Sequence, residues 1–197
     1  MREIILLSNS PRRKELLSAI GIPFKIEIND LIEDPPSSKE LPSNYAINQA
    51  INKLEKIETR DDNIYASFDT IVVIDNKILG KPKNRDDAFN MLTRLSGKYH
   101  TVITAIALKD NTKLITDYQS TNVKFYDLSN DEIESYLDTS EPYDKAGAYG
   151  IQNKGALLIE KIEGCYFNVV GLPLPKFTRM LNQFNIDLQE IIRCRIA

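Results

Sequence analysis

Short apolar runs alternate along this chain with segments whose apolar residues recur at helical spacing. Residues 4–7 are apolar, residues 8–11 break the run, and Leu16, Leu17 and Ile20 then recur at helical spacing. This pattern predicts a strand, a tight loop and a helix that begins near Ser10 and Pro11. Because strand-like and helix-like segments interleave along the 197 residues, we expect an α/β fold.

The same two patterns, short apolar runs and apolar residues at helical spacing, predict the remaining strands and helices. Further strands are predicted over residues 24–28, 64–66, 70–74, 78–79, 101–108, 114–125 and 156–162. Further helices are predicted after the capping residues Ser43, Asn84 and Ser129, and over residues 176–184. With no repeat and no obvious interdomain linker, we treat residues 1–197 as one domain, in one body or two small lobes.

Composition removes several classes of protein. The chain has one histidine, His100, and two cysteines, Cys165 and Cys194, so a zinc site and a disulfide scaffold are nearly excluded. The 25 basic and 28 acidic residues argue against a general nucleic-acid binder. No apolar run approaches the roughly 20 residues that span a bilayer, and the first residues do not resemble a signal peptide. We therefore expect a cytoplasmic protein that binds no membrane, and any metal to be a hard cation held by oxygen.

Three cations, Arg12, Arg13 and Lys14, fall in the first turn of the first predicted helix. There they oppose the helix dipole, at a cost of up to about 1 kcal/mol each when exposed. A bound phosphate would reverse that cost, because backbone N–H groups and guanidiniums would all point at an anion. The alternative is that these side chains lie in solvent or pair with acids elsewhere.

Asp69 stands at the mouth of a very apolar predicted strand, and ligands bind at the ends of strands in α/β sheets. It could hold a metal or act as a general base, or it could simply cap the strand. Lys81 follows a strand and Lys53 lies one step off the apolar stripe of its helix. Either lysine could reach a phosphate, although the spacing alone favours a lysine in solvent.

The segment Glu141–Gln152 mixes small, aromatic and polar residues. Such a loop can bring backbone close to a flat ligand, and the side chain of Gln152 can read the edge of a base. A structured turn with packed tyrosines is the alternative. For His100 we expect a structural or a surface role, because nothing near it in sequence completes a catalytic triad.

Taken in order, these motifs resemble the Maf family of nucleoside triphosphate pyrophosphatases from Leu6 to about Phe184. The matching segments are residues 7–13, 68–72, 80–82, 95–100, 141–152 and 169–173. The resemblance implies an elongated α/β structure of two lobes around a mixed sheet, with the active site in a cleft between the lobes. It also implies hydrolysis of a nucleoside triphosphate to the monophosphate and pyrophosphate, with Mg²⁺ or Mn²⁺ as cofactor.

The resemblance assigns a role to each candidate residue. Asp69 matches the general base, and Glu33 and Asp69 match the positions that hold the metal. The substrate-binding positions are Ser8, Arg12, Arg13, Lys53, Thr70, Lys81 and Gln152. Arg12, Thr70 and Gln152 stand where the dTTP/UTP-directed branch of the family selects its base, with CTP and modified pyrimidine nucleotides as further candidate substrates.

Two alternatives remain open at this stage. The chain could be a nucleotide-binding regulator of cell division with little turnover, since the family was first linked to septum formation. It could also be a pyrophosphatase that prefers a modified purine nucleotide. Family members often pair as dimers, which leaves a homodimer open. One departure from the family pattern is Phe68, which replaces a small residue and could crowd the cleft or turn into the core.

Overall fold

One mixed sheet of seven strands forms in the computed structural model, which describes residues 2–28, 40–55, 57–60 and 62–193. The strands are β1 (Ile4–Leu6), β2 (Phe24–Ile26), β3 (Ile64–Ile74), β4 (Lys77–Leu79), β5 (Tyr99–Lys109), β6 (Leu114–Phe125) and β7 (Ile159–Glu163). Their order is β2-β1-β3-β5-β6-β7, and β4 pairs with β3. β1 runs parallel to β2 and β3, whereas the β3–β4 and β6–β7 pairs are antiparallel. The expected α/β fold with a mixed sheet is confirmed.

The helices connect these strands and mostly begin where the sequence predicts, except that α2 begins at Pro42, so Ser43 lies inside it and is not its cap. They are α1 (Pro11–Ala19), α2 (Pro42–Glu55), α3 (Arg85–Leu95), α4 (Asn130–Leu137), α5 (Tyr166–Val170), α6 (Leu174–Met180) and α7 (Leu188–Ile192). Asn84 caps α3, and Ser129 forms a complete capping box with Glu132 at α4. Ser10 is the N-cap of α1, but its side chain makes no capping bond. Within the described residues no helix has both the length and the hydropathy to cross a membrane.

Two predicted boundaries are wrong. The strands expected over residues 64–66 and 70–74 are one continuous strand, β3, so Asp69 lies inside a strand and not at its mouth. The strand expected over residues 156–162 begins only at Ile159, because a 3-10 turn occupies Asn153–Leu158. That turn follows from the left-handed backbone of Asn153, whose φ is 55°, a conformation that a strand does not use.

The chain divides into two compact units. The first unit comprises Met1–Asp69, Thr104–Gln119 and Gly171–Ala197, and the second comprises Thr70–Ile103 and Ser120–Val170. The boundary falls between Asp69 and Thr70, within β3.

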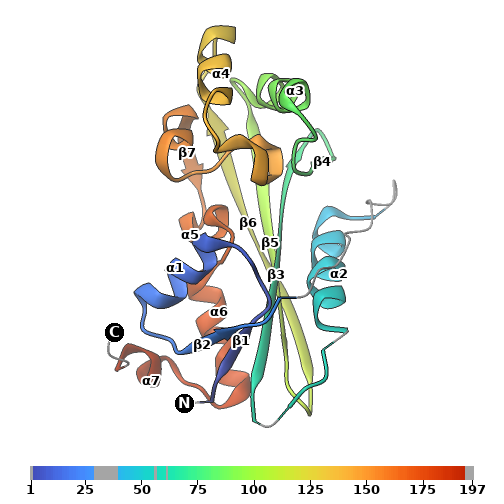
Figure 1. Cartoon of the computed structure of the whole chain (residues 1–197), viewed down its shortest axis with the longest axis vertical. Helices are drawn as coiled ribbons and strands as arrows, with labels where there is room; N and C mark the ends of the chain where they lie inside the picture. Colours follow the sequence, from blue (N-terminus) through green and yellow to red (C-terminus); the bar gives the residue numbers. More distant parts are fainter. Residues whose placement is uncertain (1, 29–39, 56, 61, 194–197) are drawn as a thin grey trace. The chain divides into compact units, whose positions relative to one another are not determined.

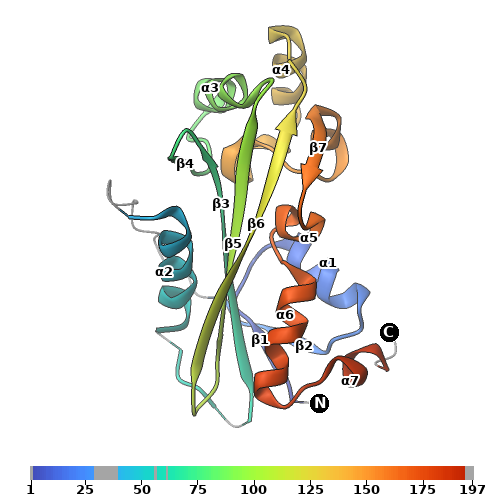
Figure 2. The same ribbon diagram turned by 180° about the vertical axis from the view of Figure 1, so that it is seen from behind.

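In the first unit, α2 and α6 cover opposite faces of the sheet (Figures 1 and 2). Consecutive residues of a strand point to opposite faces, and two neighbours on β3 show this directly. Ser67 donates a hydrogen bond to the carbonyl of Ala50 in α2, whereas the ring of Phe68 packs edge-on against Phe177 of α6. Helices on both faces bury this part of β3 completely, from Ile64 to Asp69.

In the second unit, α3 and α4 share a core with the sheet strands, with α4 drawn above the end of β6 in Figure 1. His100 on β5 is buried in this unit, 3% exposed, between the rings of Phe125 and Tyr149. Its Nε2 lies 2.7 Å from the Tyr149 hydroxyl. Burial lowers the pKa of His100 to about 4, with the backbone of Lys98 opposing that shift, so the ring is neutral at pH 7. His100 therefore has the structural role, one of the two that we expect for it.

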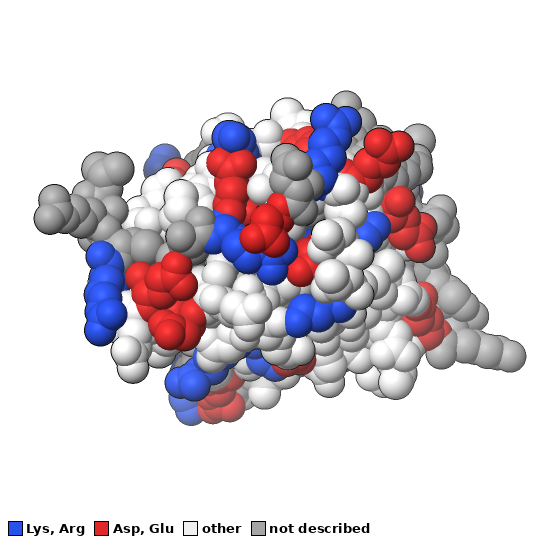
Figure 3. All heavy atoms as spheres, turned by 90° about the horizontal axis from the view of Figure 1, so that it is seen from below, with Lys and Arg blue, Asp and Glu red and all other residues white. Residues whose placement is uncertain are grey.

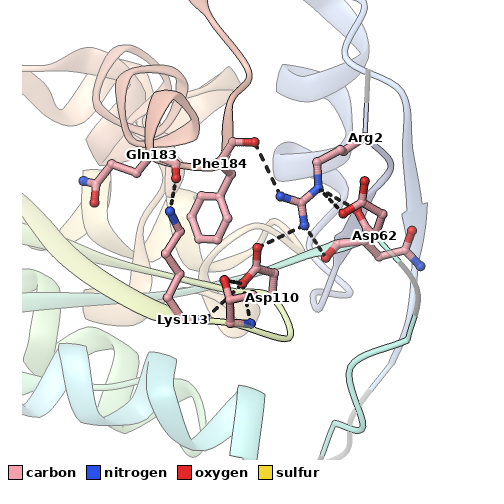
Figure 4. Close-up of polar contacts among 8 residues, drawn as sticks. Arg2, Asp62, Asp110, Lys113, Gln183 and Phe184 are labelled. Atoms are coloured by element: carbon pink, nitrogen blue, oxygen red, sulfur yellow. Dashed lines mark hydrogen bonds and ion pairs between the residues drawn. The ribbon is translucent and has the colours of Figure 1, made fainter.

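A polar cluster centred on Arg2 fixes the start of the chain in the first unit (Figure 4). The guanidinium donates to the carbonyl of Asp62 at 2.7 Å and to Oδ2 of Asp110 at 3.0 Å. Beside it, Lys113 donates to the carbonyl of Gln183 and lies over the ring of Phe184. The cluster thus ties the β5–β6 turn to both the N-terminal strand and the C-terminal helices.

Asp110 is the buried acid of this cluster, 5% exposed. Burial alone raises its pKa, but hydrogen bonds from Thr112, Arg2 and Lys113 outweigh that effect and lower the pKa from 3.8 to about 2. A carboxylate whose pKa is lower in the folded protein stabilises it above pH 3.8, and that contribution is lost as the pH falls toward 2.

We predict that Asp110→Asn lowers the free energy of unfolding at pH 7 by about 2 kcal/mol. The variant should also lose less stability than the parent between pH 4 and pH 2, because it lacks the titrating group. Urea unfolding across this range measures both effects. Asp62→Asn is the matched control, since that partner of Arg2 is 87% exposed at its side chain and should contribute less than about 0.5 kcal/mol. Equal losses in the two variants would contradict the assignment.

Candidate active site

Lys53 and Asp69 form a close ion pair in the first unit. Nζ of Lys53 lies 2.6 Å from Oδ1 of Asp69 and 3.3 Å from the carbonyl oxygen of Phe68. Both side chains are largely buried, with 18% of Lys53 and 6% of Asp69 exposed. Because an unpaired buried charge is costly, this pair fixes both groups in position. Two of the residues that the sequence nominates are thus brought together.

Strand alternation and one buried hydroxyl explain why these two side chains meet. Asp69 is two residues after Ser67, so both point to the face of β3 that α2 covers. The Ser67 hydroxyl, fully buried, donates to the carbonyl of Ala50 at 2.6 Å. Lys53 is three residues after Ala50 and therefore lies about one turn further along the same side of α2. The Ser67 bond sets the register that places Lys53 beside Asp69.

Asp69 also lies where one edge of β3 changes partner. β1 pairs with β3 from Ile64 to Ala66, and β4 pairs with it from Val72 to Ile74. In the described part of the chain, no strand pairs with residues 67–71 along that edge. Asp69 is therefore inside a strand, at a point where neither β1 nor β4 pairs with β3.

Arg13 is held by three groups of the first unit. Its Nε donates to the carbonyl of Gly171 at 2.8 Å, and its Nη1 donates to the hydroxyl of Ser8 at 2.9 Å. Its guanidinium lies over the ring of Phe68, 5.5 Å from the centroid. Ser8 and Arg13, both nominated from the sequence, are thus brought together, whereas the contact with the Gly171 carbonyl is not visible in the sequence. Arg12, beside it on α1, is half-buried.

Phe68 turns into the core. It is fully buried, and its ring centroid lies 5.5 Å from that of Phe177 in an edge-on arrangement. Of the two outcomes left open for this departure from the family pattern, the structure shows the second. The ring supports Arg13 on one face of β3, while the Phe68 carbonyl contacts Lys53.

The other nominated residues belong to the second unit. Thr70 and Gln152 are half-buried, and Lys81 is exposed two residues after the end of β4. A hydrogen bond of 3.0 Å from the N–H of Gly147 to the carbonyl of Gly80 joins the segment that carries Gln152 to the one that carries Lys81. Gly147 has a φ of 69°, and a Cβ there would meet Val72, so only glycine allows this approach.

The predicted metal ligands are placed only in part. Asp69 offers a carboxylate oxygen, the ligand type that Mg²⁺ and Mn²⁺ prefer. Glu33 lies outside the described residues. Among the residues that are described, no group of three or more His, Cys, Asp or Glu side chains gathers at a potential metal site.

Comparison with known proteins decides the family. The model of the family described as Maf-like protein matches residues 3–184. This chain belongs to the Maf family. It is 44% identical over 189 residues to dTTP/UTP pyrophosphatases of Bacillus cereus and Bacillus anthracis, covering 95% of this chain and 98% of each relative.

A solved structure extends the comparison to the fold. The chain resembles a HAM1 protein from Coxiella burnetii with a TM-score of 0.52, over 93% of this chain and all of that one. At 13% identity this match shows a common fold and nothing more. For the Maf relatives, the near-complete coverage means that all candidate residues from Ser8 to Gln152 fall within the family match.

We predict that Ser67→Ala lowers the free energy of unfolding by about 1 kcal/mol, because it removes a fully buried hydrogen bond between β3 and α2. Chemical denaturation measures the loss. Thr93→Ala is the matched control, since its exposed hydroxyl donates to a carbonyl of its own helix at 2.9 Å and should contribute less than about 0.5 kcal/mol. Unchanged stability of Ser67→Ala would show that this bond does not hold α2 in register.

Proposed function

We propose that this protein hydrolyses dTTP and UTP between the α- and β-phosphates, releasing the nucleoside monophosphate and pyrophosphate. The observation that carries the proposal is the 44% identity, over 95% of the chain, to curated dTTP/UTP pyrophosphatases. The site geometry agrees with it, because Lys53 pairs with the buried carboxylate of Asp69 on β3 and Arg13 lies over the ring of the neighbouring Phe68. CTP and modified pyrimidine triphosphates belong to the substrate panel, and the working compartment that we propose is the cytoplasm.

We assign phosphate binding to the lysine and arginine side chains of the site. A triphosphate carries about four negative charges at neutral pH, so several cations are needed to bind it and to offset the charge that develops during reaction. Arg13 lies over the ring of Phe68 on one face of β3, and Lys53 pairs with Asp69 on the other. We assign the phosphates to these two residues together with Ser8, Arg12 and Lys81. Thr70 and Gln152 are assigned to the base.

We assign activation of the attacking water to Asp69. Its carboxylate would orient the attacking water and accept its proton. A divalent cation, held by Asp69 and Glu33, would lower the pKa of that water and neutralise phosphate charge. Lys53 keeps the Asp69 carboxylate fixed through the 2.6 Å contact. No histidine is needed for this chemistry, which agrees with a single, buried histidine in the chain.

Binding of free nucleotides, in preference to nucleic acid, fits the charges on one face of the molecule. The face drawn in Figure 3 carries Lys and Arg side chains interspersed with Asp and Glu, with no continuous basic patch. Sequence-independent binding to nucleic acid depends on such a patch. A homodimer remains part of the proposal, and light scattering of the purified protein would test it.

An assay of pyrophosphate release tests the proposal directly. The panel is dTTP, UTP, CTP, ATP and GTP with modified purine and pyrimidine triphosphates, each with Mg²⁺ or Mn²⁺. We expect the highest kcat/KM with dTTP and UTP. Nucleotide binding without release of pyrophosphate would favour a regulator. A clear preference for a modified purine would contradict the assignment of a pyrimidine base.

We predict that Asp69→Asn lowers kcat for UTP by about 10²- to 10⁴-fold, because the amide cannot accept the proton of the attacking water. Asp75→Asn is the control, since Asp75 lies in the β3–β4 turn with its side chain 62% exposed. Circular dichroism and thermal unfolding establish that each variant is folded. Turnover near the parent rate in a folded Asp69→Asn variant would remove Asp69 from the reaction.

We also predict that Phe68→Leu raises KM for UTP about fivefold and changes kcat by less than threefold. The variant removes a cation–π contact with Arg13, and such a contact contributes about 1 kcal/mol. Phe177→Leu is the matched control, because it disturbs the same ring pair from the α6 side without touching Arg13. Equal changes of KM in the two variants would indicate a general packing effect.

A further inference from the structure

We propose that Glu141 and Tyr136 are positioning residues for base selection, because they fix both ends of the segment Gly150–Gly155 that carries Gln152. The inference rests on the proposed function, in which Gln152 contacts the base. All the contacts that support it lie within the second unit.

Glu141 holds the end of the segment that follows Gln152. Its Oε1 accepts the backbone N–H of Lys154, and its Oε2 accepts that of Gly155, both at 3.2 Å. Two hydrogen bonds to one carboxylate restrain the orientation as well as the position of the backbone. Residues two and three places after Gln152 are thereby fixed to a single side chain.

Tyr136 of α4 holds the other end. Its hydroxyl accepts the N–H of Gly150 at 3.4 Å, two residues before Gln152, and donates to Oε2 of Glu141, also at 3.4 Å. Tyr136 is 5% exposed, and burial raises the pKa of its hydroxyl, so the group stays protonated and keeps the proton that it donates. One hydroxyl thus connects the two ends of the segment.

The packing inside this loop leaves little freedom. A Cβ added at Gly155 would collide with the carbonyl of Gly150 and would lie 2.8 Å from the Tyr136 hydroxyl. Asn153, directly after Gln152, has a left-handed backbone with a φ of 55°. A residue other than glycine in this region carries strain of about 1 kcal/mol and stays there only when its surroundings hold it. The bonds to Glu141 and Tyr136 supply that restraint.

A structural role alone predicts a different outcome from a positioning role. If these residues only stabilise the fold, their removal lowers stability and leaves the preference among bases unchanged. If they position Gln152, their removal relaxes that preference and leaves turnover of the preferred substrate nearly intact. Preference among nucleotides is therefore the decisive measurement.

The experiment compares Tyr136→Phe and Glu141→Gln with Tyr143→Phe. The control loses a tyrosine hydroxyl of the same loop, which donates to the carbonyl of Leu137 at 2.9 Å and contacts neither end of the Gln152 segment. The measurements are kcat/KM for UTP, dTTP, CTP and ATP, and the affinities for UMP and AMP by calorimetry. We expect the preference for UTP over ATP to fall about 10-fold in the two test variants, with kcat for UTP within threefold of the parent and Tyr143→Phe unchanged.

A double-mutant cycle makes the test sharper. Gln152→Ala should lower the same preference, and Gln152→Ala combined with Tyr136→Phe should lower it no further, because both changes act through one side chain. Additive losses, or an unchanged preference in both Tyr136→Phe and Glu141→Gln, would overturn the inference. A parent that releases no pyrophosphate would instead contradict the proposed function. In that case the affinities for UMP and AMP still test the inference. A preference for UMP over AMP that weakens in the test variants supports positioning. A parent protein with no preference for UMP over AMP overturns the inference.

Discussion

The alternation of side chains along β3 determines the geometry of the first unit. Ser67 and Asp69 face α2, and Phe68, between them, faces α6. A shift of one residue would send the carboxylate into the apolar core beside Phe177 and expose the ring to the polar site. The buried hydrogen bond from Ser67 to Ala50 opposes such a shift. The ion pair of Lys53 with Asp69 needs the same register of β3 against α2.

Local patterns in the sequence predict the fold class and most elements because those features are encoded over a few residues. Asn84 and the Ser129–Glu132 box cap the helices as expected, since capping bonds join residues only three apart. The prediction that failed is the strand end at Asp69. A charged residue between two apolar runs indicates a strand end, but here β5 pairs along one edge while β1 and β4 share the other. Tertiary pairing of this kind overrides the local preference.

The candidate site is less accessible to sequence reasoning because its contacts join distant residues. The motifs nominate Ser8, Arg13, Lys53 and Asp69, and the structure pairs them. It also adds partners that no local pattern contains. The carbonyl of Gly171 holds Arg13 across 158 positions of sequence, and the ring of Phe68 supports it across 55 positions. A backbone carbonyl has no residue-type signature, so its role becomes visible only when the chain is folded.

Arg13 and Lys53, which contact the neighbouring residues Phe68 and Asp69 of β3, are prepared for an anion in different ways. Arg13 is held by a backbone carbonyl, a serine hydroxyl and an aromatic face, so it loses little conformational entropy when a phosphate arrives. Lys53 is paired with a carboxylate, so a phosphate must share or compete for its ammonium group. Under the proposed function, Arg13 serves affinity for the triphosphate, while any phosphate contact by Lys53 is coupled to the state of Asp69. That coupling links binding of the charged substrate to the group that we assign to the water.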